Sequence, residues 1–362
     1  MKFIIISKAH VQNFPRIISL ASSAKEIDYE VEIITQNILE DTQTLLSNMG
    51  IQVSNIKNKV SQICFRKVWH WYRFARFANG KYLKMEKDSI IWITGADTAI
   101  CMGLNVLKKR NFYFQINELY DLFPNYLKNL KKISQYAQKI IVPEKNRAAI
   151  FQVWFRLKET PYVLPNKPFF DETLISKGNN LYKEYIEHLT EERKKGKKIL
   201  LYQGHLIKDR NLSQFLNVTK EFKNILVVLM GYDHGIIENY RQIDPSLYYI
   251  PSIPAPFHLS ITSCADLGLL VYLPESLNNI YCAPNKIWEY SKYGLALIGN
   301  NIVGLEMITS NQIGIQCNIE NIEDIKNKLS FLLTNLDFFK KNSLQYFENI
   351  NYMKIFMDII DK

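Results

Sequence analysis

Residues 267–298 read LGLLVYLPESLNNIYCAPNKIWEYSKYGLALI, and the order of polar and apolar residues in this stretch decides the fold. An apolar run at 267–272 is typical of a buried strand, and a second run at 295–298 is typical of another. Between them lie a loop and a short helix that ends near Gly294. Strand, helix and strand in succession form the repeating unit of an open α/β sheet. The stretch therefore predicts parallel strands joined by helical crossovers.

The same alternation occupies most of the chain and restarts once. Three prolines (Pro161, Pro165 and Pro168) and a polar stretch at 176–180 mark a boundary between the two series. We therefore predict two α/β units of similar size, each with a parallel sheet. The predicted strands are residues 3–6, 29–35, 51–53, 90–93, 112–116, 140–142, 199–202, 225–230, 248–251, 267–272, 295–298 and 313–316.

Composition places the chain among soluble globular proteins. Hydrophobic residues make up 47% of its 362 residues and charged residues 22%. No apolar run approaches the ~18–20 residues that span a bilayer, and we interpret the apolar start of the chain as a first strand and not as a signal peptide. Five scattered cysteines without a Cys-x-x-Cys pair indicate neither a disulfide framework nor a zinc site. We expect a cytoplasmic protein.

The excess positive charge is concentrated at residues 57–87, which hold nine Lys or Arg and one acid. The same stretch is rich in aromatic rings. On a helix, basic residues of this stretch would lie on one side and aromatic residues on another. A helix of this kind suits an anionic membrane surface. Two alternatives stay open, because rings at helical spacing also pack in cores and basic patches also bind nucleic acid, although no nucleic-acid module is visible. The predicted membrane-binding residues are Arg66, Lys67, Trp69, Trp71, Arg73, Phe74 and Arg76.

The helix that begins near Pro284 has the features of an anion site. Proline suits the first turn of a helix, and the free N–H groups of that turn attract negative charge together with the helix dipole. Lys286 adds a full charge, Asn285 lies beside it, and Glu289 follows one turn later on the same side. A phosphate at the helix start and a sugar diol on the carboxylate would together bind a nucleotide sugar. The alternative is a surface helix with a Lys–Glu pair.

A second loop is predicted to open onto the same sheet edge. Residues 203–211 follow the strand at 199–202 and contain Gly204, His205 and Arg210. The carboxyl ends of parallel strands share one edge, where open α/β sheets bind ligands. Arg210 and His205 are therefore candidates for contact with a diphosphate. The alternative is a solvated turn with a helix cap.

In the first unit, the strand at 112–116 is followed by Glu118 and Asp121. These carboxylates are placed to orient a sugar hydroxyl or to take its proton, or else to cap a helix. His10, in the loop after the first strand, is more readily explained as a hydrogen-bonding loop residue than as a base. The chain contains neither a Gly-x-Gly-x-x-Gly nor a Gly-Lys-Ser/Thr phosphate loop, which argues against dinucleotide and NTPase functions.

These motifs resemble those of the GT-B glycosyltransferases, especially the retaining family four. Gly-His-Leu at 204–206, followed by Arg-Asn at 210–211, occupies the place of that family's Gly-Arg-Leu loop with Lys-Gly or Lys-Asn behind it. Residues 289–294 match the second half of its Glu-x7-Glu signature, whereas Tyr281 stands at the first Glu. A bacterial polysaccharide-synthesis subset also has Pro-Asn-Lys, as at 284–286. Residues 164–166 resemble the interdomain linker, and the last helix resembles the one that returns to the first domain.

The resemblance implies an α/β protein of GT-B fold, with two Rossmann-like domains facing across a cleft. It implies an acceptor-binding domain at 1–165, onto which a helix at 345–362 packs back, and a nucleotide-sugar-binding domain at 166–344. The implied activity is that of a retaining hexosyltransferase of EC class 2.4, which needs no metal or other cofactor. The implied substrates are a UDP- or GDP-sugar and a lipid-linked glycan in bacterial surface polysaccharide synthesis, at the inner face of the plasma membrane and without nucleic acid.

The implied roles follow residue by residue. Arg210, Lys286 and Asn285, with Gly204 and His205, would bind the donor, and Glu289 would hold its ribose. Two alternatives remain. One is a non-catalytic GT-B homologue that binds a partner or a glycan, and the other is a sugar-nucleotide epimerase of the same fold. The acceptor-binding candidates are Glu118, Asp121 and His10, and the catalytic candidates are Lys286, Glu289, Arg210 and Asp121.

Overall fold

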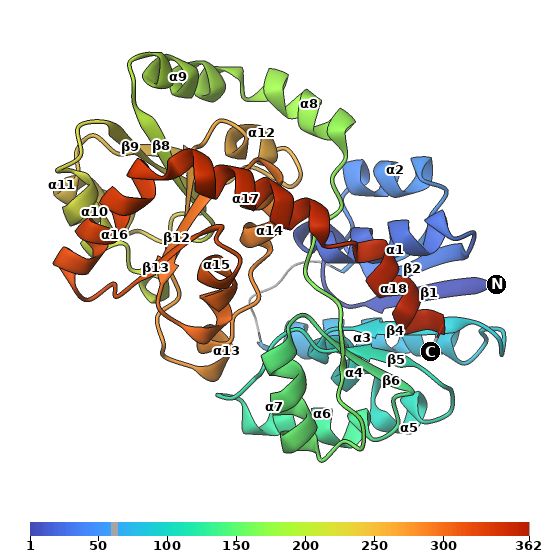
Figure 1. Cartoon of the computed structure of the whole chain (residues 1–362). Helices are drawn as coiled ribbons and strands as arrows, with labels where there is room; N and C mark the ends of the chain where they lie inside the picture. The colour runs from blue at the N-terminus through green and yellow to red at the C-terminus, as the bar shows by residue number, and fades with distance from the viewer. Residues whose placement is uncertain (59–63, 362) are drawn as a thin grey trace. The chain divides into compact units, whose positions relative to one another are not determined.

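The structure of the chain is a computed structural model that describes residues 1–58 and 64–361, with the backbone alone for residues 64–67. It divides into two compact units (Figure 1). Unit 1 comprises Met1–Phe169 together with Tyr352–Lys362, and unit 2 comprises Phe170–Asn351. These divisions lie a few residues from the predicted ones at 165/166 and 344/345.

Unit 1 contains a parallel sheet of seven strands in the order β3-β2-β1-β4-β5-β6-β7. Every strand pairs with its neighbours in parallel, as the alternation of strands and helices predicts. The strands are β1 (Lys2–Ser7), β2 (Glu30–Gln36), β3 (Gln52–Ile56), β4 (Ile90–Thr94), β5 (Tyr113–Gln115), β6 (Lys139–Val142) and β7 (Tyr162–Val163).

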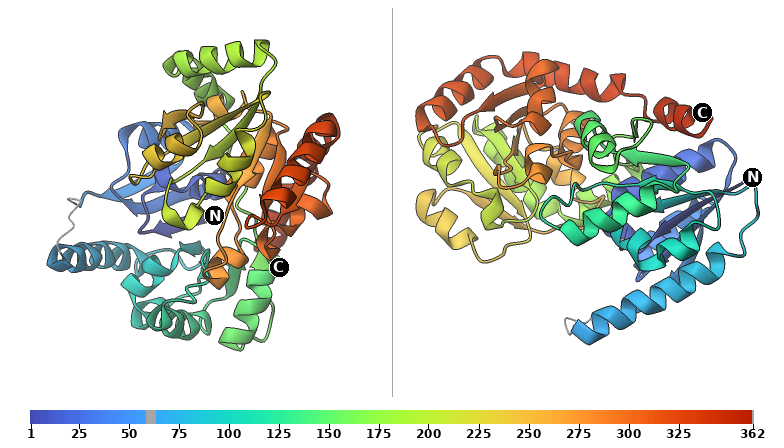
Figure 2. Two further views of the ribbon diagram at one scale, coloured as in Figure 1. Left: turned by 90° about the vertical axis from the view of Figure 1, so that its left-hand side faces the viewer. Right: turned by 90° about the horizontal axis from the view of Figure 1, so that it is seen from below.

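Helices cover both faces of this sheet (Figures 1 and 2), which explains why central strands such as β1 and β4 are apolar on both sides. One layer contains the first two helices and the last, and their apolar residues pack on Phe3, Ile5 and Trp92. The helices of unit 1 are α1 (Pro15–Glu26), α2 (Glu40–Asn48), α3 (Cys64–Tyr82), α4 (Ala96–Met102), α5 (Leu104–Leu107), α6 (Pro124–Ser134), α7 (Lys145–Phe155) and α18 (Tyr352–Asp361), with the 3-10 turn η1 (Val11–Asn13).

Unit 2 contains a parallel sheet of six strands in the order β10-β9-β8-β11-β12-β13. Its strands are β8 (Lys198–Gln203), β9 (Ile225–Gly231), β10 (Tyr248–Pro251), β11 (Leu267–Leu270), β12 (Ala296–Asn300) and β13 (Gly314–Cys317). Its helices are α8 (Glu172–Leu181), α9 (Lys183–Lys194), α10 (Ser213–Thr219), α11 (Ile237–Ile243), α12 (Leu259–Thr262), α13 (Leu277–Ile280), α14 (Asn285–Lys292), α15 (Glu306–Ser310), α16 (Ile322–Thr334) and α17 (Leu336–Asn349), with the 3-10 turns η2 (Lys208–Arg210) and η3 (Val303–Leu305).

Alternate residues of the unit 2 strands enter two separate cores. Leu200 and Tyr202 of β8 pack in one core with α10, α11 and α16, whereas Ile199 and Leu201 pack in the other with α9, α12 and α14. A strand whose side chains point alternately to two buried faces must be apolar throughout. The continuous apolar runs in the sequence are therefore a direct consequence of helices on both faces.

Each sheet has one point at which the direction of strand addition reverses. In unit 1 the reversal lies between β1 and β4, and in unit 2 it lies between β8 and β11. Open α/β sheets bind their ligands beyond the carboxyl ends of the strands at such a switch point. The loops after these four strands are therefore where the topology places candidate sites.

Every predicted strand overlaps an observed one. The differences between prediction and structure lie in the segments that connect the strands. The boundary predicted at residues 161–180 contains the short strand β7 and the helix α8. Gly103, which has a φ of 82°, separates α4 from α5. Pro284 is the N-cap of α14, so that the first helical residue is Asn285.

Candidate functional site

The two predicted donor loops meet at the switch point of unit 2. β8 and β11 pair directly, so the loop after Gln203 and the segment after Leu270 leave the sheet side by side. The first loop leads to Arg210 in η2, and the second leads through α13 to Lys286 on the first turn of α14. The order of strands therefore brings together two cations that are 76 residues apart in the sequence.

Lys286 is a half-buried cation without a counter-ion. Among the residues that the structure describes, its ammonium group makes no hydrogen bond and no ion pair. It lies 4.8 Å from the ring centre of Tyr202 and 5.8 Å from that of Tyr272. Burial and the nearby charge of Arg210 lower the pKa of Lys286 to about 8, although Glu289 opposes the shift. The surroundings of Lys286 thus disfavour the charged form of its amine.

Arg210 shares one aromatic ring with Lys286. Its guanidinium lies 3.9 Å from the ring centre of Tyr272 and donates a long hydrogen bond of 3.5 Å to Asn279 of α13. No carboxylate among the described residues pairs with either cation. Two like charges that are close enough to shift a pKa, and that form no ion pair with a described carboxylate, are suited to bind an anion.

Gly204 provides the space that the Lys286 side chain occupies. A Cβ atom at this position would lie 2.5 Å from the ammonium nitrogen of Lys286. The residue also has a φ of 139°, in the region that favours glycine. A larger residue at 204 would therefore displace the ammonium group as well as strain the loop.

Glu289 is buried on α14 and is already hydrogen-bonded. One oxygen, Oε2, accepts a hydrogen bond from the side-chain amide of Gln203, whose own oxygen accepts one of 2.8 Å from Thr262. The other oxygen, Oε1, lies 3.5 Å from Nε2 of His258. The carboxylate is therefore fixed in orientation by β8 and α12. Glu289 lies one turn after Lys286 on α14, as the sequence predicts, and its partners Gln203 and His258 are an addition from the structure.

His205 and Asn285 border the pair of cations. His205 is exposed, and its Nδ1 lies 3.1 Å from Nε2 of His234, which follows β9. Burial, His234 and the two cations all lower the pKa of His205, so a neutral imidazole is favoured. Asn285 is half-buried at the start of α14. Of the predicted donor residues, the structure thus brings Gly204, His205 and Arg210 beside the segment 285–289.

The predicted acceptor residues lie along the corresponding edge of unit 1. Glu118 is exposed just after β5, with Oε2 at 3.4 Å from a guanidinium nitrogen of Arg147. Asp121 is half-buried in the same loop. His10 is half-buried after β1, and burial together with Lys8 lowers its pKa. These three residues follow two different strands, so they do not form one cluster by themselves.

The switch point of unit 1 carries a group that sequence reasoning missed. The ammonium of Lys8 lies 3.6 Å from Asp97 and 4.3 Å from the ring centre of Trp71. Asp97 also accepts a hydrogen bond of 2.8 Å from the hydroxyl of Tyr126. Asp97 comes three residues after β4, so the rule that strand ends carry sites would have identified it.

Some of the predicted membrane-binding residues on the basic helix α3 are exposed, and others are buried. Trp69 and Tyr72 are 57% and 55% exposed and stack at 5.7 Å, and Arg76 is exposed. Phe74 is fully buried, so its assignment to a membrane surface is wrong, because the side of α3 that carries it packs in the core. Trp71 and Arg73 are half-buried. The side chains of Arg66 and Lys67 lie outside the described residues.

Comparison with protein-family models and with curated protein sequences gives no match. Solved structures match over 100% of this chain. Sucrose-phosphate synthase from Thermosynechococcus elongatus has a TM-score of 0.73 at 12% identity, over 98% of its own length. Anabaena HepE in complex with UDP and glucose has a TM-score of 0.70 at 11% identity, also over 98%. A glycosyltransferase from Rickettsia africae has a TM-score of 0.68 at 14% identity, over 99%.

These likenesses extend over both units, and they establish the fold. The chain is an α/β protein of the GT-B fold, with one Rossmann-like parallel sheet in each unit. The fold predicted from the sequence is therefore confirmed. At such low identity the likeness says nothing about which residues act, so the site has to be argued from its own geometry.

Proposed function

We propose that this chain is a glycosyltransferase that takes a sugar from a nucleotide diphosphate donor. The observation that carries the proposal is the pair of uncompensated cations, Lys286 and Arg210, at the switch point of unit 2. A diphosphate has the size and charge to lie between them. The matching structures of HepE, one with UDP and glucose and one with UDP-glucose, support a UDP-sugar, and a GDP-sugar would meet the same cations.

The cations would act on the charge that develops as the donor breaks down. The bond between the anomeric carbon and the diphosphate oxygen breaks, and both electrons leave with the nucleoside diphosphate. Lys286 and Arg210 would stabilise that growing negative charge in a site already organised for it. Their two positive charges would take the place of a metal ion, so we propose a metal-independent reaction without a further cofactor.

Glu289 would orient the donor and would not act as the base. Its carboxylate is held by Gln203 and lies beside His258, which favours a fixed hydrogen-bond acceptor for the ribose hydroxyls. The acceptor hydroxyl would bond to the anomeric carbon and pass its proton to the departing diphosphate. This route needs no separate base in unit 2 and fits the retaining outcome that the resemblance implies. Asp121 and Glu118 would position the acceptor hydroxyl.

The acceptor that we propose is a lipid-linked glycan of bacterial surface polysaccharide synthesis, reached from the inner face of the plasma membrane. None of the helices in the described chain has the length and apolarity to cross a bilayer. The exposed Trp69, Tyr72 and Arg76 on α3 support attachment to an anionic membrane surface.

The proposal is tested by thermal shift with a panel of UDP, GDP and their sugar conjugates. A nucleotide that binds the folded protein raises its melting temperature by mass action. We expect one nucleotide to stabilise the wild type and to have little effect on Lys286→Ala. Stabilisation by none would contradict the proposal and favour a non-catalytic homologue. Conversion of a sugar nucleotide without any acceptor would favour an epimerase.

Membrane attachment is tested separately by co-sedimentation with vesicles. We expect the wild type to bind vesicles that contain anionic lipid and to be released by salt, and Trp69→Ala with Tyr72→Ala to bind less. Phe331→Ala, which removes an aromatic ring of similar exposure from unit 2, is the matched control. Equal binding to neutral vesicles would contradict the electrostatic part of the proposal.

A further inference from the structure

Arg16 is a cation in unit 1 to which the described residues offer no hydrogen bond and no ion pair. It lies on the first turn of α1, which begins at the carboxyl end of β1 through η1. Its side chain is half-buried, its Nε is buried without a hydrogen bond, and no ion pair reaches it from the residues described. Its guanidinium carbon lies 4.7 Å from the ring centre of Phe14. Burial lowers the pKa of Arg16.

The surroundings of Arg16 include a second arginine. Arg147, on the first turn of α7, is close enough to oppose the charge of Arg16, while Glu118 and Tyr120 favour it. Arg147 is itself held in place, since it donates to the carbonyl of Asn117. The side-chain amide nitrogen of Asn117 is buried without an acceptor. Two buried donors, Nε of Arg16 and the amide nitrogen of Asn117, thus have no acceptor among the described residues.

An unsatisfied guanidinium at this position is costly to the free protein. A buried donor without an acceptor loses the hydrogen bonds that water would give it, and a contact with one aromatic ring replaces only part of them. The elements that meet here are the loops after β1, β5 and β6, all at the ligand-binding edge of the sheet. Tyr120, in the same loop as Glu118, has a positive φ of 57°, a strained conformation often found at functional sites.

We infer that Arg16, supported by Arg147 and the amide of Asn117, binds an oxyanion carried by the acceptor. A planar guanidinium binds a phosphate or a carboxylate with two parallel hydrogen bonds. Glu118 beside it then suits a sugar hydroxyl. The inference rests on the proposed function, because it specifies the acceptor as an anionic carbohydrate, a sugar phosphate or a sugar acid.

The test is a calorimetric titration with inorganic pyrophosphate, which reports both anion sites. We expect two sites in the wild type, one in the double variant Lys286→Ala/Arg210→Ala, and one in Arg16→Gln, with the lost site weakened on the order of tenfold or more. Two sites in Arg16→Gln would overturn the inference and leave the donor site intact. Loss of a site only through Arg16→Gln would instead contradict the donor site.

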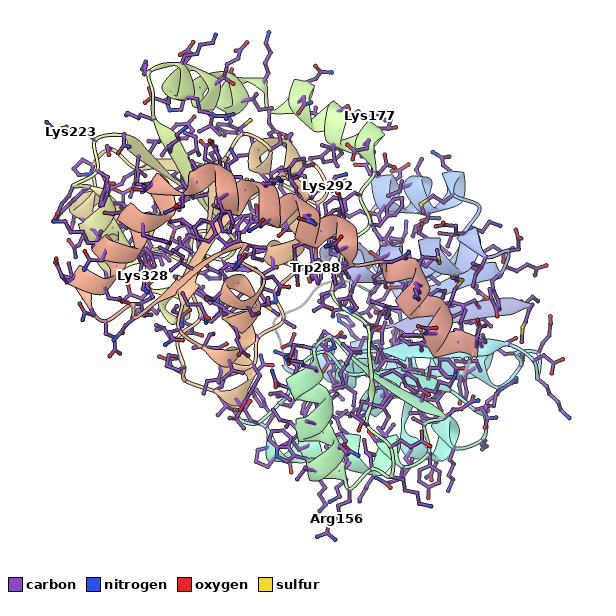
Figure 3. All side chains as sticks on the ribbon, in the orientation of Figure 1. Arg156, Lys177, Lys223, Trp288, Lys292 and Lys328 are labelled. Carbon is purple, nitrogen blue, oxygen red and sulfur yellow. The ribbon has the colours of Figure 1, made fainter. Side chains whose placement is uncertain are left out.

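Two controls separate binding from folding. Arg156→Gln removes an exposed charge from the same unit, and Figure 3 shows Arg156 directed away from the ribbon. This variant should keep both sites. Arg16→Met should melt at the same temperature as the wild type or higher, because it removes an unpaired cation, yet lose one site. A melting temperature lowered by several degrees, with both sites retained, would show that Arg16 has a structural role and would overturn the inference.

The kind of oxyanion is identified by competition in the Lys286→Ala/Arg210→Ala variant. A hexose monophosphate and a hexuronate are each tested for displacement of pyrophosphate, with a neutral hexose as control. Displacement by the monophosphate supports a phosphorylated acceptor, and displacement by the hexuronate supports an acidic sugar. Displacement by neither would contradict the assignment of this site to an acceptor.

Discussion

The switch points of the two sheets have the same topology but differ in charge balance. In unit 1 the cation after the first strand, Lys8, lies 3.6 Å from Asp97. In unit 2 Arg210 and Lys286 both lie near the ring of Tyr272, and no carboxylate among the described residues forms an ion pair with either one. A position whose charge is already neutralised suits neutral hydroxyl groups, whereas one with excess positive charge suits a diphosphate.

The difference shows how one architecture supports two kinds of binding. The strands and crossovers only bring loop residues to a common edge. Whether a cation there finds its counter-ion within the protein or in a ligand depends on a few side chains. Substitution of those side chains in one unit, with the other unit as reference, therefore tests the difference.

The largest effect is expected from removing both uncompensated cations. In Lys286→Met/Arg210→Met the nucleotide loses two charge-assisted hydrogen bonds, each of about 1.5–3 kcal/mol. We expect its affinity to fall by about 100-fold or more, measured by calorimetry with UDP or GDP. Lys8→Met in unit 1 is the matched control and should leave the affinity unchanged. Equal losses in the two variants would remove the distinction between the switch points.

A smaller effect is expected from releasing Glu289. Gln203→Leu removes the amide that holds its carboxylate, which leaves a buried oxygen unsatisfied and destabilises the fold by about 1–3 kcal/mol. We expect a rise of about tenfold in the donor KM, measured by initial rates together with denaturant unfolding. Thr262→Val, which only loosens Gln203, should have a weaker effect. Unchanged kinetics in Gln203→Leu would mean that the orientation of Glu289 is irrelevant to the donor.

The lowered pKa of Lys286 predicts a pH dependence of nucleotide binding. Above a pKa of about 8 the free amine must take up a proton before it pairs with a diphosphate. We expect affinity to fall as pH rises from 8 to 9.5, with proton uptake visible as a buffer-dependent binding enthalpy. Lys286→Met should show neither effect. A flat profile in the wild type would contradict the description of Lys286 as an unpaired, desolvated cation.

The same group predicts how stability changes with pH in the absence of ligand. The pKa of Lys286 is about 8 in the folded protein against 10.5 for an ordinary lysine. At a pH between these two pKa values, the unfolded chain holds more protons on this lysine than the folded protein does. The contribution of Lys286 to the free energy of unfolding therefore rises with pH. Comparison of wild type and Lys286→Met by chemical denaturation at pH 7.5 and 9.5 isolates that contribution. A difference between the two proteins that does not change with pH would contradict it.

The smallest effect is expected at the neutralised switch point. The pair Lys8 and Asp97 is partly exposed, and such pairs contribute about 0–1 kcal/mol. Asp97→Asn should therefore change the melting temperature slightly and leave nucleotide affinity as it was. A fall in nucleotide affinity as large as that of Lys286→Met would show that the two edges do not act separately.

Much of the fold follows from the sequence, because helices on both faces make strands apolar throughout. Runs such as 199–202 and 225–230 are unmistakable for that reason. The two-residue strand β7 carries no comparable pattern and lies among prolines. On α3 the periodicity alone did not show that Phe74 belongs to the buried side, since its neighbours are aromatic on both sides.

The part of the candidate site that lies at the carboxyl ends of strands was predictable from the sequence. The rule places Arg210 and Lys286 at one edge, and it applies equally to Asp97. Gln203 and His258 were not predictable, because the first ends a buried strand and the second precedes a short helix, and each contacts Glu289 only through the tertiary fold. That no described residue forms an ion pair with Lys286 is likewise a property of the packing, which no spacing in the sequence reveals.

The most direct measurement is a crystal structure of the protein with the nucleotide that stabilises it. We predict diphosphate oxygens within hydrogen-bonding distance of the Lys286 ammonium and the Arg210 guanidinium, beside Gly204 and the start of α14. A nucleotide bound elsewhere on the protein, with no anion in contact with either of these two cations, would contradict the proposed donor site.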